Sequence, residues 1–212
     1  MSASAERSSQ KLADPTGSGR LFVISGPSGA GKSSVVRLLR EKRPFYFSVS
    51  ATTRDPRPGE IHGVHYWFVD AADFAELIEN QELLEWADYN GRRYATLRTP
   101  VLSHLAQGED VILEIEVQGA RQVRNSYPGA VMFFILPPSV VELAQRLERR
   151  GDTSPAEITR RLGIAEQEIA EAEGLFDFLV VNEDLDRCVS EVLSFISPPG
   201  GGSTRRGRGA LY

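Results

Sequence analysis

Cysteine is almost absent from this 212-residue sequence, which contains only Cys188. A single cysteine excludes an internal disulfide and a metal site built from cysteines, and such sparing use is typical of the reducing cytosol. No apolar run approaches the ~18 residues that a membrane-spanning helix needs, and residues 1–20 lack the apolar centre of a signal peptide. We therefore expect a soluble, unexported, cytoplasmic protein with no membrane partner.

An excess of basic charge is also missing. The sequence has 24 Lys and Arg residues against 29 Asp and Glu residues, a net charge of −5, and a pI near 5.4. General nucleic-acid binders present a basic surface, so we expect small-molecule partners and no nucleic acid. The three histidines, His62, His65 and His104, share no tight metal-ligand spacing, and zinc is not expected.

The two ends of the chain differ in composition from its middle. Residues 1–19 are rich in Ser, Ala and Gly without any period, which predicts a disordered leader. Residues 197–212 contain a Pro-Pro-Gly-Gly-Gly run and three arginines, which predicts a flexible tail. The intervening length suits one domain with a full hydrophobic core.

Strand-like runs alternate with helix-like patterns in residues 20–196. Strands are predicted at 21–24, 45–49, 66–69, 111–117, 131–136 and 179–181. Helices are predicted after residue 32, over 70–79, after capping boxes that open at Ser139 and Ser154, and over 189–196. This alternation predicts an α/β fold with a parallel sheet and right-handed crossovers, and ligands at the carboxyl ends of the strands.

A phosphate-binding loop follows the first predicted strand. Gly26, Gly31, Lys32 and Ser33 meet the pattern G-x-x-x-x-G-K-[ST], with a helical pattern directly after them. The glycines let backbone N–H groups face a polyphosphate, and the helix N-terminus adds partial positive charge. We expect Lys32 to bridge the β- and γ-phosphates and the Ser33 hydroxyl to ligate Mg²⁺. The loop alone is compatible with a motor, GTPase, ATPase or kinase.

A second anion site is predicted in the run 50–60. It holds Arg54 and Arg57 three residues apart, in a segment stiffened by two prolines. The forked guanidinium group matches phosphate oxygens, and two such groups suit a terminal phosphate that carries about two charges. Taken alone, the run is also typical of an arginine-rich surface loop.

Six motifs in the same order closely resemble the guanylate kinases, from about residue 20 to residue 196. They are Gly26-Pro27-Ser28-Gly29-Ala30-Gly31-Lys32-Ser33, the run 50–60 (SATTRDPRPGE), Glu85-Trp86, Tyr94-Ala95-Thr96, Leu113-Glu114-Ile115-Glu116 before Gln118-Gly119, and RLERRG at 146–151. The resemblance implies a P-loop α/β kinase that transfers the γ-phosphoryl group of MgATP to GMP, and to dGMP as well. It implies a parallel-sheet core (20–49, 97–145 and 162–196), a GMP-binding region (50–96) and a helical lid (146–161).

The resemblance also implies roles for individual residues. The ATP site would consist of Gly26, Pro27, Ser28, Gly29, Ala30, Gly31, Lys32, Ser33 and Ser34, with Asn182 near the adenine. The GMP phosphate would be held by Arg54, Arg57, Tyr66 and Tyr94, and the guanine surrounded by Ser50, Glu85, Thr96 and Glu116, with Glu114 completing the site. Mg²⁺ would accompany the ATP.

The lid would bring arginines to the ATP phosphates. By the resemblance, Arg146, Arg150 and Arg161 would join Lys32 and Arg54 as catalytic residues by neutralising charge on the transferred phosphoryl group. From spacing alone, a solvated helical face with pairs such as Glu142 and Arg146 is the preferred interpretation of these arginines.

Two positions depart from the family pattern, which usually has Gly where this chain has Ala95 and Asp where it has Glu116. The methyl group of Ala95 would restrict the backbone beside the base if φ were positive there. Two other functions remain as alternatives: an inactive guanylate-kinase-like interaction module, and a kinase for another base, which Glu85 argues against. The sequence leaves open whether the protein is a monomer or a homodimer.

Overall fold

The computed structural model describes residues 19–89, 91–149 and 154–196. The predicted tail, all of the predicted leader except Gly19, and the lid residue Arg150 lie outside these ranges. Within them, no helix is both long and apolar enough to cross a membrane.

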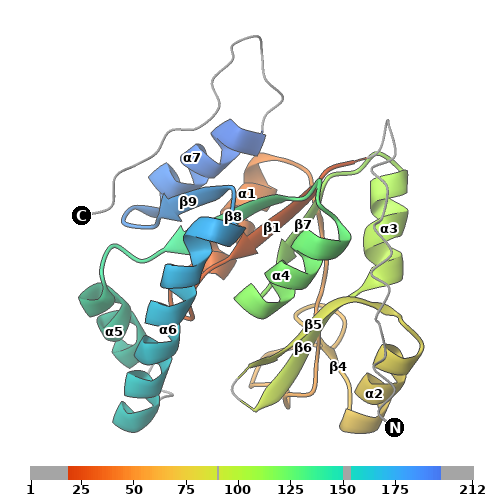
Figure 1. The fold of residues 1–212 in the computed structure, drawn as a ribbon, viewed down its shortest axis with the longest axis horizontal. Coiled ribbons are helices and arrows are strands. Elements are labelled where there is room, and N and C mark those ends of the chain that lie inside the picture. Colours follow the sequence, from red (N-terminus) through yellow and green to blue (C-terminus); the bar gives the residue numbers. More distant parts are fainter. Residues whose placement is uncertain (1–18, 90, 150–153, 197–212) are drawn as a thin grey trace, which may run out of the picture.

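The core is a five-stranded, entirely parallel sheet (Figure 1). In spatial order its strands are β2 (Tyr46–Phe47), β7 (Val111–Glu114), β1 (Leu21–Ser25), β8 (Val131–Leu136) and β9 (Phe178–Val181). The most apolar runs of the sequence form the three central strands, because a parallel sheet covered on both faces buries most side chains of its inner strands. The predicted parallel α/β architecture is confirmed.

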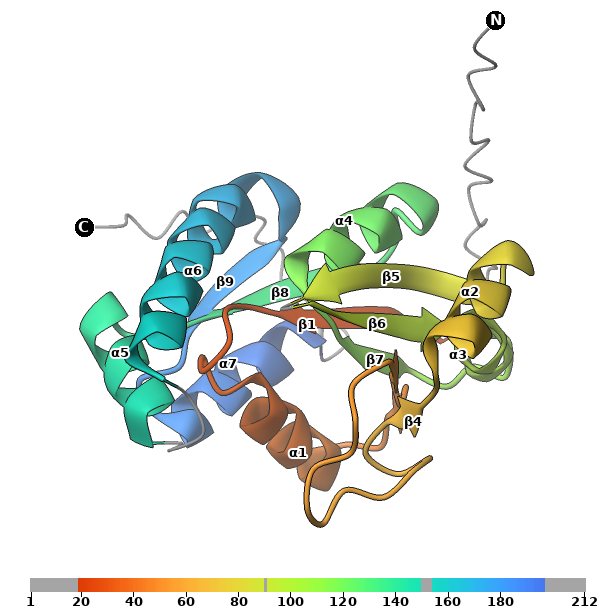
Figure 2. The ribbon, with the colours of Figure 1, turned by 90° about the horizontal axis from the view of Figure 1, so that it is seen from below.

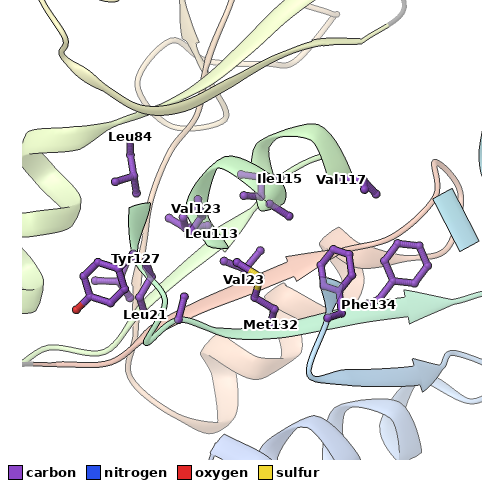
Figure 3. Packing of buried hydrophobic residues seen from close by; sticks show 14 of the residues in the cluster. Leu21, Val23, Leu84, Leu113, Ile115, Val117, Val123, Tyr127, Met132 and Phe134 are labelled. Carbon is purple, nitrogen blue, oxygen red and sulfur yellow. The ribbon is translucent and has the colours of Figure 1, made fainter. Parts of the chain in front are cut away.

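Helices cover both faces of this sheet (Figure 2). On one face lie α1 (Lys32–Lys42) and α7 (Leu185–Ile196), and on the other α4 (Val117–Ser126) and α6 (Pro155–Leu175). Strand β1 alternates between them: Leu21 and Val23 join the core cluster beneath α4, whereas Phe22 and Ile24 pack toward α1 and α7. Figure 3 shows the first of these clusters, in which Val23 and Met132 lie close to Leu113.

A second, smaller sheet projects from the core. Its strands, in spatial order, are β4 (Trp67–Phe68), β3 (Ala51–Thr52), β6 (Arg92–Leu97) and β5 (Leu83–Tyr89). Helix α2 (Ala71–Glu79) packs Phe74 against this sheet, whereas α3 (Arg98–Ala106), which follows β6, buries Val101 and Leu105 in the main core cluster. Strands β5 and β6 form an antiparallel hairpin in which Tyr89 pairs with Arg92. Leu84 of β5 reaches into the main core cluster (Figure 3), so the hairpin is anchored to the large sheet.

Helix α5 (Val140–Arg149) pairs with the N-terminal part of α6 around a separate small core of Leu143, Leu147 and Ala165. Both N-caps predicted for this pair are confirmed: the Ser139 hydroxyl accepts from the backbone N–H of Glu142 (3.1 Å), and that of Ser154 from the N–H of Glu157 (3.3 Å).

The prediction of a strand over residues 111–117 was wrong at its C-terminal end. Strand β7 stops at Glu114, and Glu116 is the extended residue before α4, which begins at Val117. Ile115 and Val117 are apolar because both are buried in the main core cluster, not because they continue the strand. The strands predicted at 45–49 and 66–69 exist but are only two residues long.

Candidate active site

The phosphate loop connects β1 to α1, as the sequence predicted. Gly26 and Gly31 have φ angles of 142° and 94°, which L side chains rarely adopt. A Cβ atom at Gly26 would also lie 2.3 Å from the carbonyl oxygen of Ile135 on β8. The loop therefore needs glycine both for its turn and for its close approach to the neighbouring strand.

Two residues far along the chain hold this loop from behind. The buried Asn182, which follows β9, donates from Nδ2 to the Ala30 carbonyl oxygen at 2.8 Å. The guanidinium of Arg146 donates to the Asn182 carbonyl oxygen at 3.0 Å, and its Nε donates to Glu142 at 3.1 Å. Arg146 is thus placed beside the loop by α5. The Glu142–Arg146 pair expected from spacing alone is confirmed.

Lys32 and Ser33 open α1 at the mouth of the loop. Lys32 Nζ donates to the carbonyl oxygens of Gly26 (2.5 Å) and Pro27 (3.3 Å). The Ser33 hydroxyl donates to Glu114 Oε1 at 2.6 Å, across the junction between α1 and the carboxyl end of β7. The Lys32 ammonium group and the hydrogen-bonded pair of the Ser33 hydroxyl and the Glu114 carboxylate therefore lie next to the phosphate loop.

The predicted second anion site is folded around Glu60. Arg54 donates to both carboxylate oxygens of Glu60 at 2.9 Å, and the backbone N–H of Arg57 donates to Glu60 Oε2 at 2.7 Å. The hydrogen bond from Arg54 is the main cause that lowers the pKa of Glu60, and the same bond raises the pKa of Arg54. The guanidinium group also lies 5.3 Å from the ring centroid of Tyr66. Glu60 therefore sets the position of Arg54.

Glu85 on β5 is a buried carboxyl group, only 3% exposed. The Thr96 hydroxyl on β6 donates to its Oε1 at 2.6 Å. Burial raises the pKa of Glu85 to about 7, the Thr96 hydrogen bond opposes that rise, and the nearby Glu116 carboxylate adds to it. A buried carboxyl group that titrates near neutrality is typical of a functional site.

One cavity of about 440 Å³ joins these groups. Of the residues predicted for the ATP and GMP sites, the cavity is lined by Ser28, Lys32, Ser33, Ser50, Arg54, Arg57, Tyr66, Glu85, Tyr94, Glu114 and Glu116, and of the predicted lid arginines by Arg161. The predicted residues Gly26, Pro27, Gly29, Ala30, Gly31, Ser34, Thr96, Asn182 and Arg146 do not line it. Of these, Thr96 and Asn182 are buried behind the site. The cavity wall thus combines phosphate-loop residues and arginines with carboxyl groups, of which that of Glu85 is buried.

Several residues of this wall were not predicted from the sequence as site residues. They are Arg37 and Arg40 on α1, Glu60, Tyr89 on β5, and Arg92 on β6. Burial raises the pKa of Tyr89 to about 12, the Glu116 carboxylate adds to the rise, and a hydrogen bond with Ser28 opposes it. Tyr89 therefore connects the small sheet with the phosphate loop. Only the Arg37–Arg40 spacing, one helical turn, was visible as a signal in the sequence.

An oxygen-rich corner of the cavity fits Mg²⁺. No cluster of three or more His, Cys, Asp or Glu residues suited to a metal occurs in the described part of the chain. Mg²⁺, however, is commonly bound by one or two protein oxygens together with substrate phosphates and water. The Ser33 hydroxyl and the Glu114 carboxylate, 2.6 Å apart, provide such a pair beside the phosphate loop.

The structure settles one concern about the departures from the family pattern. Ala95 is not among the described residues with positive φ, of which Gln81 is the only one that is not glycine. Its side chain is packed with Phe74 and Leu83 in the small core of the second sheet. Glu116 Oε2 is buried and has no hydrogen-bond partner among the described residues, and its carboxylate helps to raise the pKa values of Glu85, Tyr66 and Tyr89.

The chain is similar to guanylate kinases in sequence and in fold. The family model described as guanylate kinase matches residues 18–198. The guanylate kinase of Thermobifida fusca is 52% identical over 181 residues, which cover 85% of this chain and 92% of the relative. That of Synechococcus sp. (strain JA-3-3Ab) is 49% identical over 189 residues, which cover 89% and 87%. The crystal structure of the Anaplasma phagocytophilum guanylate kinase has a TM-score of 0.70 at 31% identity and covers 85% of each chain.

A parallel sheet with a phosphate loop after its first strand, opening onto a cavity with a second cluster of arginines, defines a P-loop α/β kinase. The match over nearly all of the described residues makes the assignment specific. The chain belongs to the guanylate kinase family.

Proposed function

We propose that this protein transfers the γ-phosphoryl group of ATP to GMP, giving ADP and GDP. One observation carries the proposal: a single cavity is lined by a phosphate loop with its lysine, by two acceptor-loop arginines and by a buried carboxyl group suited to guanine. Relatives named guanylate kinase, at about half identity over most of the chain, support it. The intact Lys32 and Ser33 disfavour the alternative of an inactive interaction module.

The acceptor phosphate binds to Arg54 and Arg57 with the hydroxyls of Tyr66 and Tyr94. A guanidinium group carries five N–H donors, so Arg54 can keep its paired bonds to Glu60 and still donate to a phosphate oxygen. Glu60 also orders the loop through the backbone N–H of Arg57. The arginine is therefore held in place before the substrate arrives, which reduces the entropy lost on binding.

Guanine is recognised by Glu85, with Ser50 and Glu116 around the base and Thr96 behind it. An ionised carboxylate accepts from guanine N1–H and from the 2-amino group at the same time. Adenine has a lone pair at N1 and no 2-amino group, so it offers Glu85 neither bond. The Thr96 hydroxyl holds Oε1 in position and favours the ionised form. Specificity for guanine follows from this fork.

Phosphoryl transfer proceeds in line, without a covalent intermediate on the enzyme. Positioning and charge neutralisation are the main contributions of the protein to such reactions. Lys32 moves from the loop carbonyls to the β- and γ-phosphates, because the phosphate oxygens are the stronger acceptors. Arg161 lies on the cavity wall, held by Glu157 at 3.0 Å, and acts with Arg146 and Arg150 on the transferred group.

Mg²⁺ would be held by the Ser33 hydroxyl, with Glu114 beside it, and would supply charge neutralisation on the ATP phosphates. The remaining ATP contacts are assigned to the backbone of residues 26–31 and to Ser34, with Asn182 near the adenine. The GMP-binding region 50–96 and the lid 146–161 close on the core 20–49, 97–145 and 162–196 and exclude water. Use of dGMP, a monomeric or dimeric state and a cytoplasmic location stay predictions from the sequence.

The test is ADP formation from MgATP with a panel of nucleoside monophosphates, with GDP identified chromatographically. We expect phosphorylation of GMP far above that of AMP, CMP or UMP, and loss of the activity when Mg²⁺ is chelated. Equal use of GMP and AMP, or binding of GMP without any ADP formation, would contradict the proposal.

A further inference from the structure

Gly119 on α4 lies directly against the carboxyl group of Glu85. A Cβ atom at Gly119 would lie 1.9 Å from Glu85 Oε2 and 2.8 Å from its Cδ atom. No carbon side chain fits at such distances, so the absence of a side chain at 119 provides the space that Oε2 occupies. The other oxygen, Oε1, is held by the Thr96 hydroxyl at 2.6 Å. The carboxyl group is thus fixed on one side by a hydroxyl and on the other by a helix backbone.

We propose that Gly119 is a positioning residue for base recognition: it lets Glu85 present both of its oxygens to guanine. The inference rests on the proposed function, because it concerns how the same carboxylate is aimed. Gly119 does not touch the nucleotide in this account. It acts through Glu85 alone.

The helix itself gives no reason for glycine at this position. Gly119 is the third residue of α4 and is absent from the glycines with positive φ, so alanine would fit its backbone. Alanine is also the better helix former. Gly163 and Gly174 in α6 are different, since a Cβ atom at either would have no atom of the described part of the chain within 4 Å. Close approach of a neighbour is therefore specific to Gly119 among these helical glycines.

Helix α4 cannot easily move away from β5 to make room for a side chain. The side chain of Gln122 accepts from the Trp86 backbone N–H at 3.2 Å and donates to the Trp86 carbonyl oxygen at 2.5 Å. The side chain of Gln118 accepts from the Asp88 N–H at 3.2 Å. Strand β5 is at the edge of its sheet, and these two side-chain amides form the hydrogen bonds that a partner strand would otherwise provide.

A methyl group at 119 would therefore move the Glu85 carboxylate rather than the helix. A displacement of at least about 1 Å is needed to bring Oε2 to an allowed distance, and a shift of that size can cost about 100-fold in a positioned interaction. In this proposal Oε1, held by Thr96, accepts from guanine N1–H, and Oε2 accepts from the 2-amino group. Displacement of Oε2 therefore removes the bond that hypoxanthine lacks, and guanine is distinguished less well from hypoxanthine.

The experiment compares Gly119→Ala with Gly163→Ala, a matched change in a helix with open space. For Gly119→Ala we expect the KM for GMP to rise about 10- to 100-fold, the GMP-to-IMP ratio of kcat/KM to fall, and the KM for ATP to stay unchanged. Gly163→Ala should match the parent protein in all three quantities. An unchanged GMP-to-IMP ratio in a folded Gly119→Ala protein would overturn the inference.

A double variant keeps the test decisive if Gly119→Ala folds poorly. Glu85→Ala removes the group that the new methyl would strike, so Glu85→Ala/Gly119→Ala should melt at or above the temperature of Glu85→Ala alone. A lower melting temperature in the double variant would show that the methyl meets something else. Failure of the proposed function is recognised separately, because the parent protein itself would then show no preference for GMP over IMP and AMP.

Discussion

The raised pKa of Glu85 predicts that recognition of GMP depends on pH near neutrality. Burial places this pKa at about 7 in the free protein, and the fork to guanine needs the ionised carboxylate. The ionised fraction rises from roughly one-tenth at pH 6 to roughly nine-tenths at pH 8. We therefore expect kcat/KM for GMP, which reports groups of the free enzyme, to rise about tenfold over this range from Glu85 alone.

Glu85→Gln is the control, because an amide does not titrate and is nearly the same size. The phosphate group of GMP itself loses a proton near pH 6, and that contribution is common to both proteins. The assay is kcat/KM for GMP at saturating MgATP from pH 6 to pH 8, with the KM for ATP measured in parallel. Profiles of the same shape for the parent protein and Glu85→Gln would refute the reasoning.

The raised pKa of Glu85 also predicts that the free energy of unfolding falls as pH rises, although activity toward GMP increases. A carboxyl group whose pKa is raised from 4.5 to about 7 on folding binds more protons in the folded state, so stability is lost as pH rises through that window. The loss is about 3 kcal/mol, or roughly 6–12 °C in melting temperature for a domain of this size. Glu85→Gln should melt higher than the parent at pH 8 and close to it at pH 4.5. Glu168, whose pKa burial also raises to about 7, contributes equally to both proteins.

Three further variants test the other parts of the cavity. Lys32→Ala should lower kcat by about 10²–10³ with little change in melting temperature, since Lys32 Nζ is hydrogen-bonded to carbonyl oxygens of the phosphate loop; near-normal turnover would remove the phosphate-loop mechanism. Arg54→Lys should raise the KM for GMP about tenfold more than that for ATP, because lysine cannot reproduce the fork, whereas equal effects would place Arg54 elsewhere. Asn182→Ala should cost about 1 kcal/mol of stability and raise the KM for ATP selectively, as it releases Ala30; an unchanged KM for ATP would contradict this role.

The parts of the fold that could be predicted are those with local causes. The phosphate loop follows from glycines and a lysine at fixed spacing, and the N-caps at Ser139 and Ser154 follow from a hydroxyl three residues before a glutamate. Strand β7 was predicted too long because burial in the core makes Ile115 and Val117 look like strand residues. Local pattern cannot separate a buried strand from a buried connection.

The hairpin of β5 and β6 was not predicted, although Asn90-Gly91 is a strong hairpin signal in the sequence. Strand β5 has no clean alternation, because both of its faces are packed: Leu83 lies in the core of the small sheet and Leu84 in the main core cluster. Contacts between distant segments could not be predicted either, because sequence patterns describe only neighbouring residues. Nothing local indicates that Asn182 holds the phosphate loop, or that Gly119 lies against Glu85.

The claim that Glu85 reads guanine is tested most directly by kcat/KM for GMP, IMP and AMP on the parent protein, Glu85→Gln and Glu85→Ala. In the parent protein we expect GMP to exceed AMP by roughly 10⁴–10⁵, with IMP between them because it keeps N1–H but lacks the 2-amino group. Glu85→Gln should narrow the gap between GMP and IMP, since its amide has one acceptor oxygen, and Glu85→Ala should narrow it further at a large loss of activity. A GMP-to-IMP ratio that stays the same in both variants would contradict the account.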